Sequence, residues 1–380
     1  MEIYLDNSAT TKPYEEVIEA TSSAMRNYYG NPSSAHGLGF KAEKKLRSAR
    51  VNIAKSINAS SEEIIFTSGG SESNNFLIKG FAKIGSDIIT TKIEHPSVLN
   101  TFKALEDLEV KVTYIDVDGS GRIDVDQLIS SITRDTQIVS LMHVNNEVGV
   151  VQDIELIGKL IKEKSSRVKF HVDAVQSYGK LPIDVQKSNI DLLSTSAHKI
   201  HGPRGIGFAY IRKGLIPRSL ISGGGQERNL RSGTENLPGI VGFETAAEII
   251  CKNQYENFNK VLEVKKYFIE KLSSIEDVII NSKLGDNFTP YILSVSFKGV
   301  KGEVLLHSLE DKGIYVSTGS ACSAKSHKNS EILKALGRTL EEQGGTIRFS
   351  FSQYNNKDEV DYVIIELNKI LKFLRKLNKR

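Results

Sequence analysis

The feature that most constrains the fold is a regular alternation of short apolar runs with segments of helical period between residues 63 and 211. The runs are rich in Ile, Val and Phe and are bounded by turn-forming or polar residues, a pattern typical of buried strands. Because helical segments separate most of the runs, the pattern predicts an α/β protein with a mostly parallel sheet and helices on both faces. The predicted strands are 63–67, 87–91, 111–115, 136–142, 168–172, 190–193 and 207–211.

Polar side chains recur just after the carboxyl ends of these predicted strands. They are His95, Asn146, Asp173, Gln176, His198 and Lys199. Open α/β sheets bind their ligands at that edge. A single histidine there is more often structural than functional, but the recurrence at one edge favours a binding site.

One polar stretch, residues 194–205, lies between two predicted strands and carries Lys199 with His198 and His201 beside it. A lysine amine condenses with an aldehyde only when it is neutral, and burial beside other cationic groups favours the neutral form. Lys199 is therefore a candidate for a Schiff base. The alternative is a connecting loop that carries Lys and His without a chemical role.

A glycine pair, Gly69 and Gly70, follows the strand 63–67 and leads through Ser71 into a helix predicted over 76–83. A strand, glycines, a hydroxyl and a helix in this order present free backbone N–H groups to a phosphate, and the helix dipole assists. The stretch lacks the GxGxxG and Walker patterns, so it does not indicate a dinucleotide or a nucleoside triphosphate. The alternative is a helix cap with a tight turn.

A second glycine-rich segment, 222–225, leads into residues 231–236. The Ser-Gly-Thr sequence that ends at Thr234 could supply further phosphate-binding donors. Helical spacing then continues from residue 239 to residue 271. The chain of 380 residues is too long for one compact core, so we expect two domains, with the boundary near Tyr255.

The two cysteines have different surroundings. Cys251 lies in an apolar helical run and is interpreted as a core residue. Cys322 has small neighbours and is followed by Lys325, His327 and Lys328, and nearby cations favour the reactive thiolate. The alternative for Cys322 is an unreactive thiol in a loop. Neither a CxxC nor an HxxxH spacing is present, so no metal site is predicted.

The overall composition excludes several classes of protein. A net charge of +4 with well-mixed acids and bases gives little reason to expect direct binding to nucleic acid. The first residues, Met1 to Asp6, do not form a charged leader followed by an apolar core, so no signal peptide is expected, and no apolar run is long enough to span a bilayer. Two cysteines far apart in the sequence fit a reducing compartment, so we expect a cytoplasmic location.

The chain resembles a known family at several places. The stretch Ser196-Ala197-His198-Lys199-Ile200-His201-Gly202-Pro203-Arg204-Gly205, together with Ser320-Ala321-Cys322 and Arg348-Phe349-Ser350, is similar to the pyridoxal-phosphate-dependent cysteine desulfurases of the NifS/IscS type. These are class V aminotransferases of fold type I. The resemblance extends from Tyr4 to the strand that carries Arg348. Around Cys322 it follows the long-loop group and not the Arg-x-Gly-x-x-Cys pattern.

The resemblance implies a fold with two unequal domains. The large domain, residues 11–255, would hold a mostly parallel seven-stranded sheet flanked by helices and would bind the cofactor. The smaller α+β domain, residues 1–10 and 256–380, would carry the Cys322 loop and Arg348.

The resemblance also implies the residues around the ring of the cofactor, pyridoxal 5′-phosphate. Lys199 would bond to its aldehyde and later carry a proton. His95 would stack on the ring, and Asp173 would pair with the ring nitrogen, which makes the ring an electron sink. Gln176 would hydrogen-bond the phenolic oxygen. Asn146 is also expected at the cofactor.

The phosphate and the substrate would be held by further residues. The phosphate would be bound by Gly70, Ser71, Ser196 and His198, and by Thr234 across a homodimer. The substrate carboxylate would be bound by Asn146 and by the planar fork of Arg348. Cys322 would attack the sulfur of the bound substrate and carry it away as a persulfide.

The function implied is cysteine desulfurase: L-cysteine to L-alanine, with the persulfide passed to an iron–sulfur scaffold or a tRNA-thiolation enzyme. The chain departs from the family where a basic stretch, with Lys325 and Lys328, replaces an acidic Leu-Glu-Pro element, and where His201 stands at a position that is commonly Tyr. The first departure leaves the sulfur acceptor open. The alternatives are an aminotransferase or a selenocysteine lyase of the same fold, and a non-catalytic protein that binds pyridoxal phosphate.

Overall fold

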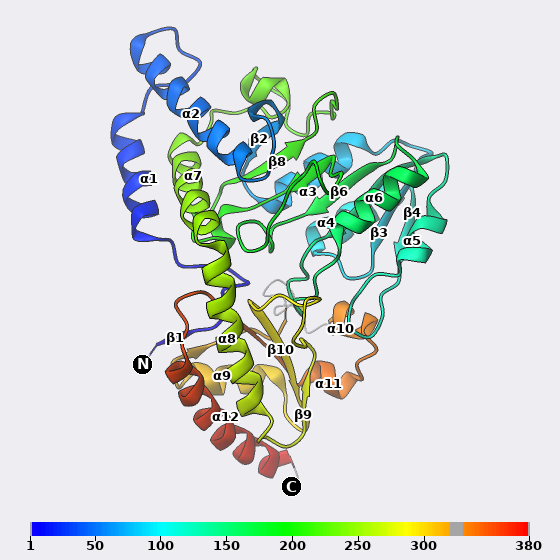
Figure 1. The fold of residues 1–380 in the computed structure, drawn as a ribbon, viewed down its shortest axis with the longest axis vertical. Helices are drawn as coiled ribbons and strands as arrows, with labels where there is room; N and C mark the ends of the chain where they lie inside the picture. The colour runs from blue at the N-terminus through cyan, green and yellow to red at the C-terminus, as the bar shows by residue number, and fades with distance from the viewer. Residues whose placement is uncertain (1, 320–329, 379–380) are drawn as a thin grey trace.

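The computed structural model describes residues 2–319 and 330–378. Figure 1 shows a broad upper part, in which helices surround a sheet, and a narrower lower part, which ends in the long C-terminal helix. The helix pair α7 (Leu237–Lys252) and α8 (Gln254–Leu272) runs from one part into the other.

The central sheet has the order β2-β8-β7-β6-β5-β3-β4, with seven strands among the described residues. All neighbouring pairs are parallel except those of β8, which runs antiparallel to both β2 and β7. The predicted α/β class and mostly parallel sheet are therefore confirmed. The strands are β2 (Ile64–Thr67), β8 (Gly207–Ile211), β7 (Leu192–Ser194), β6 (Lys169–Asp173), β5 (Thr136–Met142), β3 (Asp87–Thr91) and β4 (Lys111–Ile115).

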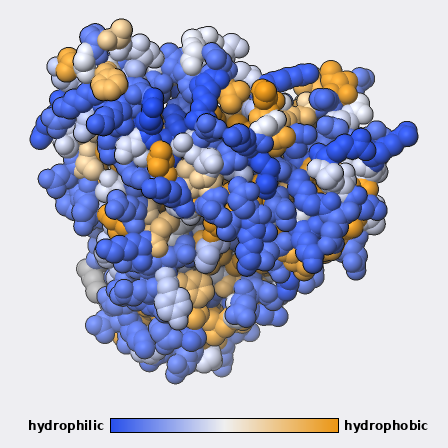
Figure 2. Space-filling view, turned by 45° about the horizontal axis from the view of Figure 1, so that its top comes forward, coloured by the Kyte–Doolittle hydropathy of each residue, from blue (hydrophilic) through white to orange (hydrophobic). Residues whose placement is uncertain are grey.

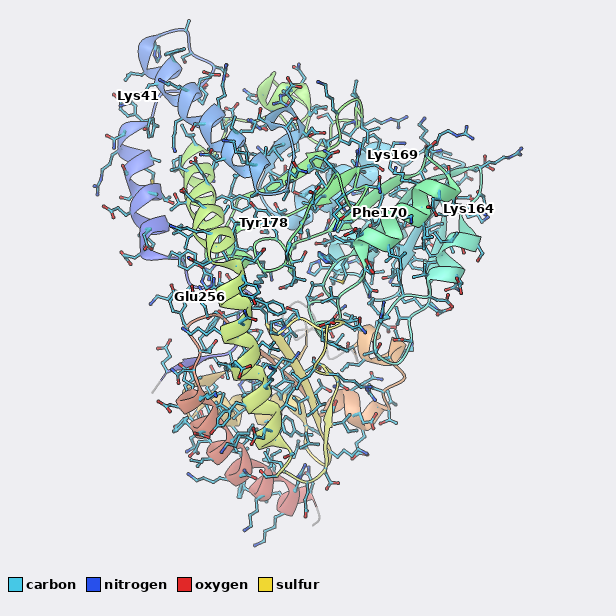
Figure 3. All side chains as sticks on the ribbon, viewed as in Figure 1. Lys41, Lys164, Lys169, Phe170, Tyr178 and Glu256 are labelled. Carbon is cyan, nitrogen blue, oxygen red and sulfur yellow. The ribbon has the colours of Figure 1, made fainter. Side chains whose placement is uncertain are left out.

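Both faces of this sheet are covered, which explains why its strands read as continuous apolar runs. Consecutive residues of one strand enter different core clusters: Ile88 packs on one face and Ile89 on the other. One face packs against α3 (Gly70–Phe81) and α4 (Pro96–Glu106). The other face packs against α1 (Glu15–Asn27), α2 (Gly37–Lys55), α5 (Val125–Ser131), α6 (Ile154–Lys164) and α7. In Figure 3, Phe170 and Tyr178 point into the interior while Lys164 points outward.

The lower part has its own apolar core. Strand β10 (Ile292–Phe297) pairs antiparallel with β12 (Thr346–Ser350) and with β9 (Val278–Ile280). Strand β1 (Ile3–Tyr4) pairs parallel with β11 (Ile314–Tyr315). The helices of this part are α8, α9 (Gly302–Glu310), α10 (Glu331–Ala335), α11 (Leu340–Gly344) and α12 (Lys357–Asn378).

The two cores are built from separate ranges of the chain. The core on the α7 side of the large sheet contains residues from Tyr14 to Ile250, whereas the lower core contains Ile3 and Leu5 together with residues from Val261 onward. We therefore propose the division into 11–255 and 1–10 with 256–380, for which these two clusters are the support.

Two helix boundaries differ from those predicted. Helix α3 begins at Gly70 rather than at residue 76, because packing of its apolar face overrides the low helix propensity of its Ser, Gly and Asn residues. The helical stretch predicted over 239–271 breaks at Asn253, because α7 packs in the upper core and α8 in the lower core.

The face of the molecule in Figure 2 is mainly hydrophilic, with scattered apolar side chains. Among the described residues, no helix has both the length and the apolar character needed to cross a membrane.

Candidate active site

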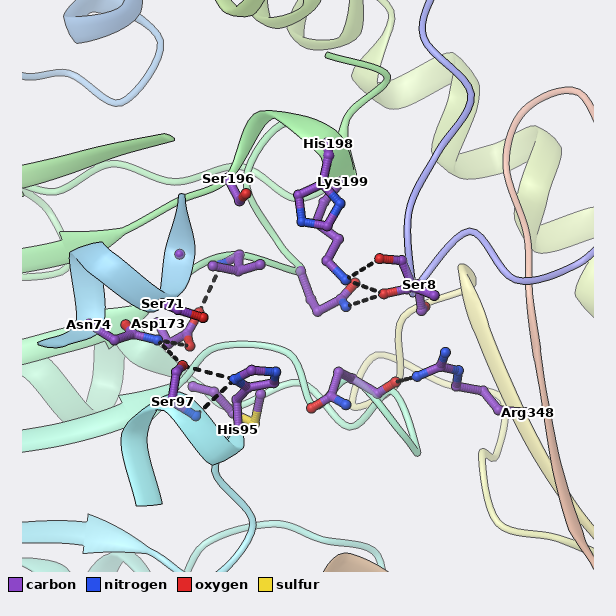
Figure 4. Close-up of a pocket in the computed structure, with 16 residues that line it drawn as sticks. Ser8, Ser71, Asn74, His95, Ser97, Asp173, Ser196, His198, Lys199 and Arg348 are labelled. Atoms are coloured by element: carbon purple, nitrogen blue, oxygen red, sulfur yellow. Dashed lines mark hydrogen bonds between the residues drawn. The ribbon is translucent and has the colours of Figure 1, made fainter. Parts of the chain in front are cut away.

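A cavity of about 230 Å³ opens at the carboxyl ends of the central strands, between the large sheet and β12 (Figure 4). Most of the site residues expected from the sequence line it. They are Gly70, Ser71, His95, Asn146, Asp173, Gln176, Ser196, His198, Lys199 and Arg348. Thr234 is not among its lining residues, and Cys322 lies outside the described residues.

Asp173, the last residue of β6, is buried and held by hydrogen bonds. Its Oδ2 accepts from Nδ2 of Asn74 at 2.8 Å, and its Oδ1 accepts from the backbone N–H of Val175 at 3.0 Å. Asn74 also donates to Oγ of Ser97 at 2.9 Å, so it links α3, β6 and α4. Sequence reasoning missed Asn74, because its helix was predicted to begin at residue 76.

His95 precedes the first turn of α4 and its side chain faces the cavity. Its Nδ1 accepts from the backbone N–H of Ser97 at 3.1 Å, which places the proton of the neutral ring on Nε2. Burial lowers the pKa of His95; the charge of Asp173 opposes this shift and the charge of Lys199 adds to it. A neutral, flat ring therefore lines the cavity near physiological pH.

Lys199 belongs to a single 3-10 turn, η2 (Ala197–Lys199), which follows β7. Its Nζ donates to the main-chain oxygens of Ser8 and Ala9, the second at 2.9 Å. Gln176 donates through Nε2 to the same oxygen of Ser8 at 2.9 Å. The start of the chain thus forms one wall of the cavity, which the sequence pattern did not predict (Figure 4).

His198 lies beside Lys199 and is also tied to the start of the chain. Its Nδ1 is 3.2 Å from Oγ1 of Thr10, and its main-chain oxygen accepts from the N–H of Thr11 at 2.9 Å. Burial, and after it the charges of Lys199 and Arg204, lowers the pKa of His198 to about 3. The imidazole is therefore neutral and can donate one hydrogen bond to an anion.

The amino end of α3 lies next to this cavity. A Cβ added at Gly70 would lie 2.5 Å from Cγ2 of Val175, so the helix start approaches its neighbours closely only because residue 70 is glycine. A second, open cavity of about 430 Å³ adjoins the first there and shares Ser71, Ser196 and His198 with it. Free backbone N–H groups and the helix dipole suit a phosphate at this end.

Arg348 projects from β12 to the opposite end of the cavity and is almost fully buried. Its Nη1 donates to the main-chain oxygen of Asn146 at 2.8 Å, and its Nη2 donates to Oδ1 of Asp6 at 2.8 Å. Within the described residues, Nε of Arg348, Oδ1 of Asn146 and Oε1 of Gln176 have no hydrogen-bond partner. Buried polar atoms are normally satisfied, so these atoms indicate a polar ligand in the cavity.

Glu147 lies at this end of the cavity and contacts described residues on both sides of 320–329. Its Oε2 accepts from Oγ of Ser330 at 2.6 Å, and a Cβ added at Gly319 would lie 3.4 Å from the same oxygen. The described residues on both sides of 320–329 therefore lie against one carboxylate, next to Asn146.

Thr234 lies on an exposed segment that is anchored to α2 and α3. Arg231 pairs with Glu72 of α3 at 2.8 Å. Glu227 accepts from both terminal nitrogens of Arg50, at 2.6 and 2.7 Å. These pairs hold the segment beside the amino end of α3, while Thr234 is exposed and is not among the residues that line the cavity.

The described ranges 2–319 and 330–378 contain no group of three or more His, Cys, Asp or Glu side chains arranged to hold a metal ion. The cavity itself is lined by a lysine, a carboxylate, two imidazoles and an arginine. A flat polar ligand with an anionic end fits this arrangement, with the anion at α3 and a carboxylate at Arg348.

Comparisons with known proteins point the same way. The family model for aminotransferase class-V matches residues 3–363. Cysteine desulfurase IscS of Dictyoglomus turgidum is 42% identical over 382 residues, which are 99% of this chain and 96% of that protein. Cysteine desulfurase IscS of Clostridium botulinum is likewise 42% identical, over 383 residues and the same shares.

Solved structures agree in fold. A NifS-like protein superposes with a TM-score of 0.92 at 40% identity, covering 98% of this chain and 100% of its own. SspA in complex with cysteine superposes with a TM-score of 0.82 at 37% identity, covering 93% of this chain and 100% of its own. The chain therefore belongs to the class-V aminotransferase family, among the relatives named cysteine desulfurase.

Proposed function

We propose that the protein is a cysteine desulfurase that binds pyridoxal 5′-phosphate in the cavity beside Lys199 and converts L-cysteine to L-alanine. The observation that carries the proposal is the convergence of a lysine amine, a buried carboxylate and an arginine fork in one cavity, namely Lys199, Asp173 and Arg348. The relatives named cysteine desulfurase, which match nearly the whole chain, support the same reaction.

The residues of the cavity fit this cofactor. Gly70, Ser71, Ser196 and His198 suit its phosphate, because they surround the amino end of α3. Asp173 suits a protonated ring nitrogen, and His95 suits a place against the ring. Nε2 of Gln176 already donates one hydrogen bond to the main-chain oxygen of Ser8, so its second hydrogen would be the one to reach the phenolic oxygen of the cofactor. When bound, the cofactor supplies an electron sink for negative charge on the substrate carbon.

The side chains of this protein would then divide the reaction between them. Arg348 and Asn146 hold the substrate carboxylate, and Lys199 moves a proton to and from the substrate. The Cys322 thiolate attacks the sulfur of the bound cysteine. A sulfur–sulfur bond forms on Cys322, the carbon–sulfur bond breaks with its electron pair left on carbon, and that carbon takes up one proton to become the methyl group of alanine.

The protein is further proposed to act as a homodimer. Thr234 is exposed and is not among the residues that line the cavity of its own chain. Arg231, three residues earlier, forms an ion pair with Glu72 of α3. A second copy of the chain would give Thr234 a phosphate to contact. The persulfide sulfur is expected to pass to an acceptor protein, an iron–sulfur scaffold or a tRNA-thiolation enzyme.

The test is the production of sulfide and L-alanine from L-cysteine in the presence of dithiothreitol. Lys199→Ala is expected to abolish both products, and Cys322→Ala is expected to abolish sulfide release while the visible absorbance of the bound cofactor is kept. Cys251→Ala is the matched control, because burial raises the pKa of the Cys251 thiol to about 11 and makes it unreactive.

The same variants separate the alternatives of this fold. If Cys322→Ala still cleaves cysteine, or if only selenocysteine is cleaved, a lyase that does not use the thiol replaces the desulfurase. If the wild type forms no alanine but exchanges amino groups with a keto acid, an aminotransferase replaces it. If the cofactor binds and no amino acid reacts, the protein is a non-catalytic binder.

A further inference from the structure

Arg348, proposed above to receive the substrate carboxylate, already contacts a carboxylate of the chain itself. Oδ1 of Asp6 lies 2.8 Å from Nη2 of Arg348. The arginine side chain is 2% exposed and the aspartate side chain is 20% exposed, so the pair is largely shielded from water. Asp6 belongs to the start of the chain, which is far from Arg348 in sequence but adjacent to it in space.

The backbone fixes both partners of this pair. Asp6 forms a parallel bridge with Ser350, and the N–H of Ser350 donates to the oxygen of Leu5 at 2.7 Å. The N–H of Arg348 donates to the oxygen of Ser317 at 2.6 Å. Because both backbones are held in a pairing of strands, the distance between the carboxylate and the guanidinium is set by the fold and not by chance rotamers.

The contacts of the guanidinium leave part of it available. Nη1 donates to the main-chain oxygen of Asn146 and Nη2 donates to Asp6, whereas Nε has no partner among the described residues. A planar guanidinium with two of its nitrogens fixed cannot turn, so its remaining donors keep one direction. Asp6 therefore holds the fork in place for a second carboxylate.

The charge of Asp6 has a separate effect from its hydrogen bond. A substrate carboxylate at Arg348 would lie close to the Asp6 carboxylate in a poorly hydrated place, and like charges there repel. A second amine, that of Lys180, lies within electrostatic reach of Arg348: burial, and after it the charge of Arg348, lowers the pKa of Lys180 to about 8.

We propose that Asp6 is a positioning residue for Arg348 that orients the fork through its oxygen and weakens carboxylate binding through its charge. The inference rests on the proposed function, because it assumes that an α-amino acid occupies the cavity. Weakened binding lets L-alanine leave, since product and substrate carry the same carboxylate. Asp6 thus sets the affinity of the cavity for the carboxylate of substrate and product, and it takes no part in the transfer of sulfur.

The two effects can be separated by substitution. Asp6→Asn keeps an oxygen for Nη2 but removes the charge, so KM for L-cysteine and the dissociation constant of L-alanine are expected to fall roughly threefold to tenfold. Asp6→Ala removes the oxygen as well as the charge and leaves the guanidinium free to turn, so KM for L-cysteine and the dissociation constant of L-alanine are expected to rise about tenfold or more. Asp6→Glu keeps charge and oxygen and is expected to remain within about threefold of the wild type.

The assay is a titration of the holoenzyme with L-alanine, followed by its visible absorbance, together with kcat and KM for L-cysteine. Asp126→Asn, on the exposed face of α5, is the control for loss of one negative charge. Opposite shifts for Asp6→Asn and Asp6→Ala support the proposal. Equal shifts of these constants in the two variants, or no shift in either, overturn the proposal. If Asp6→Ala does not fold, tighter binding of L-alanine by Asp6→Asn than by Asp6→Glu supports the proposal, and equal binding by the two overturns it.

The outcome also separates this inference from the proposed function. A wild type that releases no sulfide but binds L-alanine, with opposite shifts in the two variants, would refute the desulfurase and keep the role of Asp6. An active desulfurase with unchanged alanine binding in every variant would refute the role of Asp6 alone. A wild type that binds no L-alanine would refute both.

Discussion

The pair formed by Arg50 and Glu227 anchors the segment that leads to Thr234, and its loss has a calculable effect. Both terminal nitrogens of Arg50 donate to Glu227, at 2.6 and 2.7 Å, and Oε2 of Glu227 also accepts from the N–H of Phe66 at 2.9 Å. The side chains are only 11% and 2% exposed. Arg50 is further held by the oxygen of Ile64, at 2.9 Å.

This anchor opposes a strained backbone. Glu227, Arg228 and Asn229 all have positive φ, at 44°, 59° and 64°. A left-handed conformation costs roughly 1–2 kcal/mol for each such residue, so the turn persists only because its contacts hold it. The buried bidentate pair is the contact best placed to do so.

Glu227→Gln leaves the buried guanidinium of Arg50 without a counter-charge. We expect the free energy of unfolding to fall by about 3–5 kcal/mol, the usual effect of removing one partner of a buried pair. The substitution Arg50→Met should lower the free energy of unfolding by a similar amount, because it leaves the Glu227 carboxylate buried and unpaired. The double variant should lose much less than the sum of the two, since no unpaired charge remains.

The assay is urea unfolding of the four proteins of this cycle, followed by far-UV circular dichroism. Asn52→Ala is the matched control, because Asn52 donates to the Glu244 carboxylate at 2.7 Å elsewhere on α2. A hydrogen bond to one of two oxygens is worth less, about 1.5–3 kcal/mol. Strictly additive single variants, or losses no larger than that of the control, would refute the reasoning about the anchor.

Three further predictions follow from single contacts. Burial lowers the pKa of Lys265 to about 7, against about 10.4 in an unfolded chain. Between these two pH values the unfolded state binds more protons than the folded state, so the free energy of unfolding should rise with pH when it is measured by urea unfolding. The substitution Lys265→Met should abolish that rise. Gly70→Ala sets a Cβ 2.5 Å from Val175, so the dissociation constant of pyridoxal phosphate should rise about tenfold in a titration of the apoprotein, and Val175→Ala in the same chain should restore it. Asn74→Ala removes a donor from the buried Asp173 carboxylate, so the unfolding free energy of the apoprotein should fall by about 1–3 kcal/mol; a change within error would mean that water replaces the amide.

The sheet and most of its ligand-facing residues could be predicted because their signals are local. A strand buried on both faces is an unbroken apolar run, and polar residues directly after such runs fall at one edge of the sheet. Asp173 is the last residue of one such strand and Lys199 comes shortly after another, and both line the cavity. The start of α3 was harder to predict, because Ser71 and Asn74 are weak helix formers. Their helix is stabilised by the packing of its later apolar residues in the core.

The wall formed by the start of the chain could not be predicted by such reasoning. Ser8 and Ser350 are 342 positions apart, and Ser8 and Lys199 are 191 positions apart. In both contacts Ser8 contributes main-chain atoms, which carry no residue-specific signal. Neither periodicity nor composition of the first residues indicates that they enter a site, so only the folded structure brings Asp6 and Ser8 into it.

The course of the chain explains why these residues serve two parts of the cavity at once. Strand β1 pairs with β11 in the lower part, whereas α1 packs in the upper part, so the residues between them must cross the cavity. Residues 7–14 belong to no helix or strand, and their main-chain oxygens are therefore free to accept from Lys199 and Gln176. The same crossing begins at Asp6, which holds Arg348. A displacement of the lower part relative to the upper part would thus be felt at both Lys199 and Arg348, which couples the carboxylate end of the site to its amine end through one short stretch of backbone.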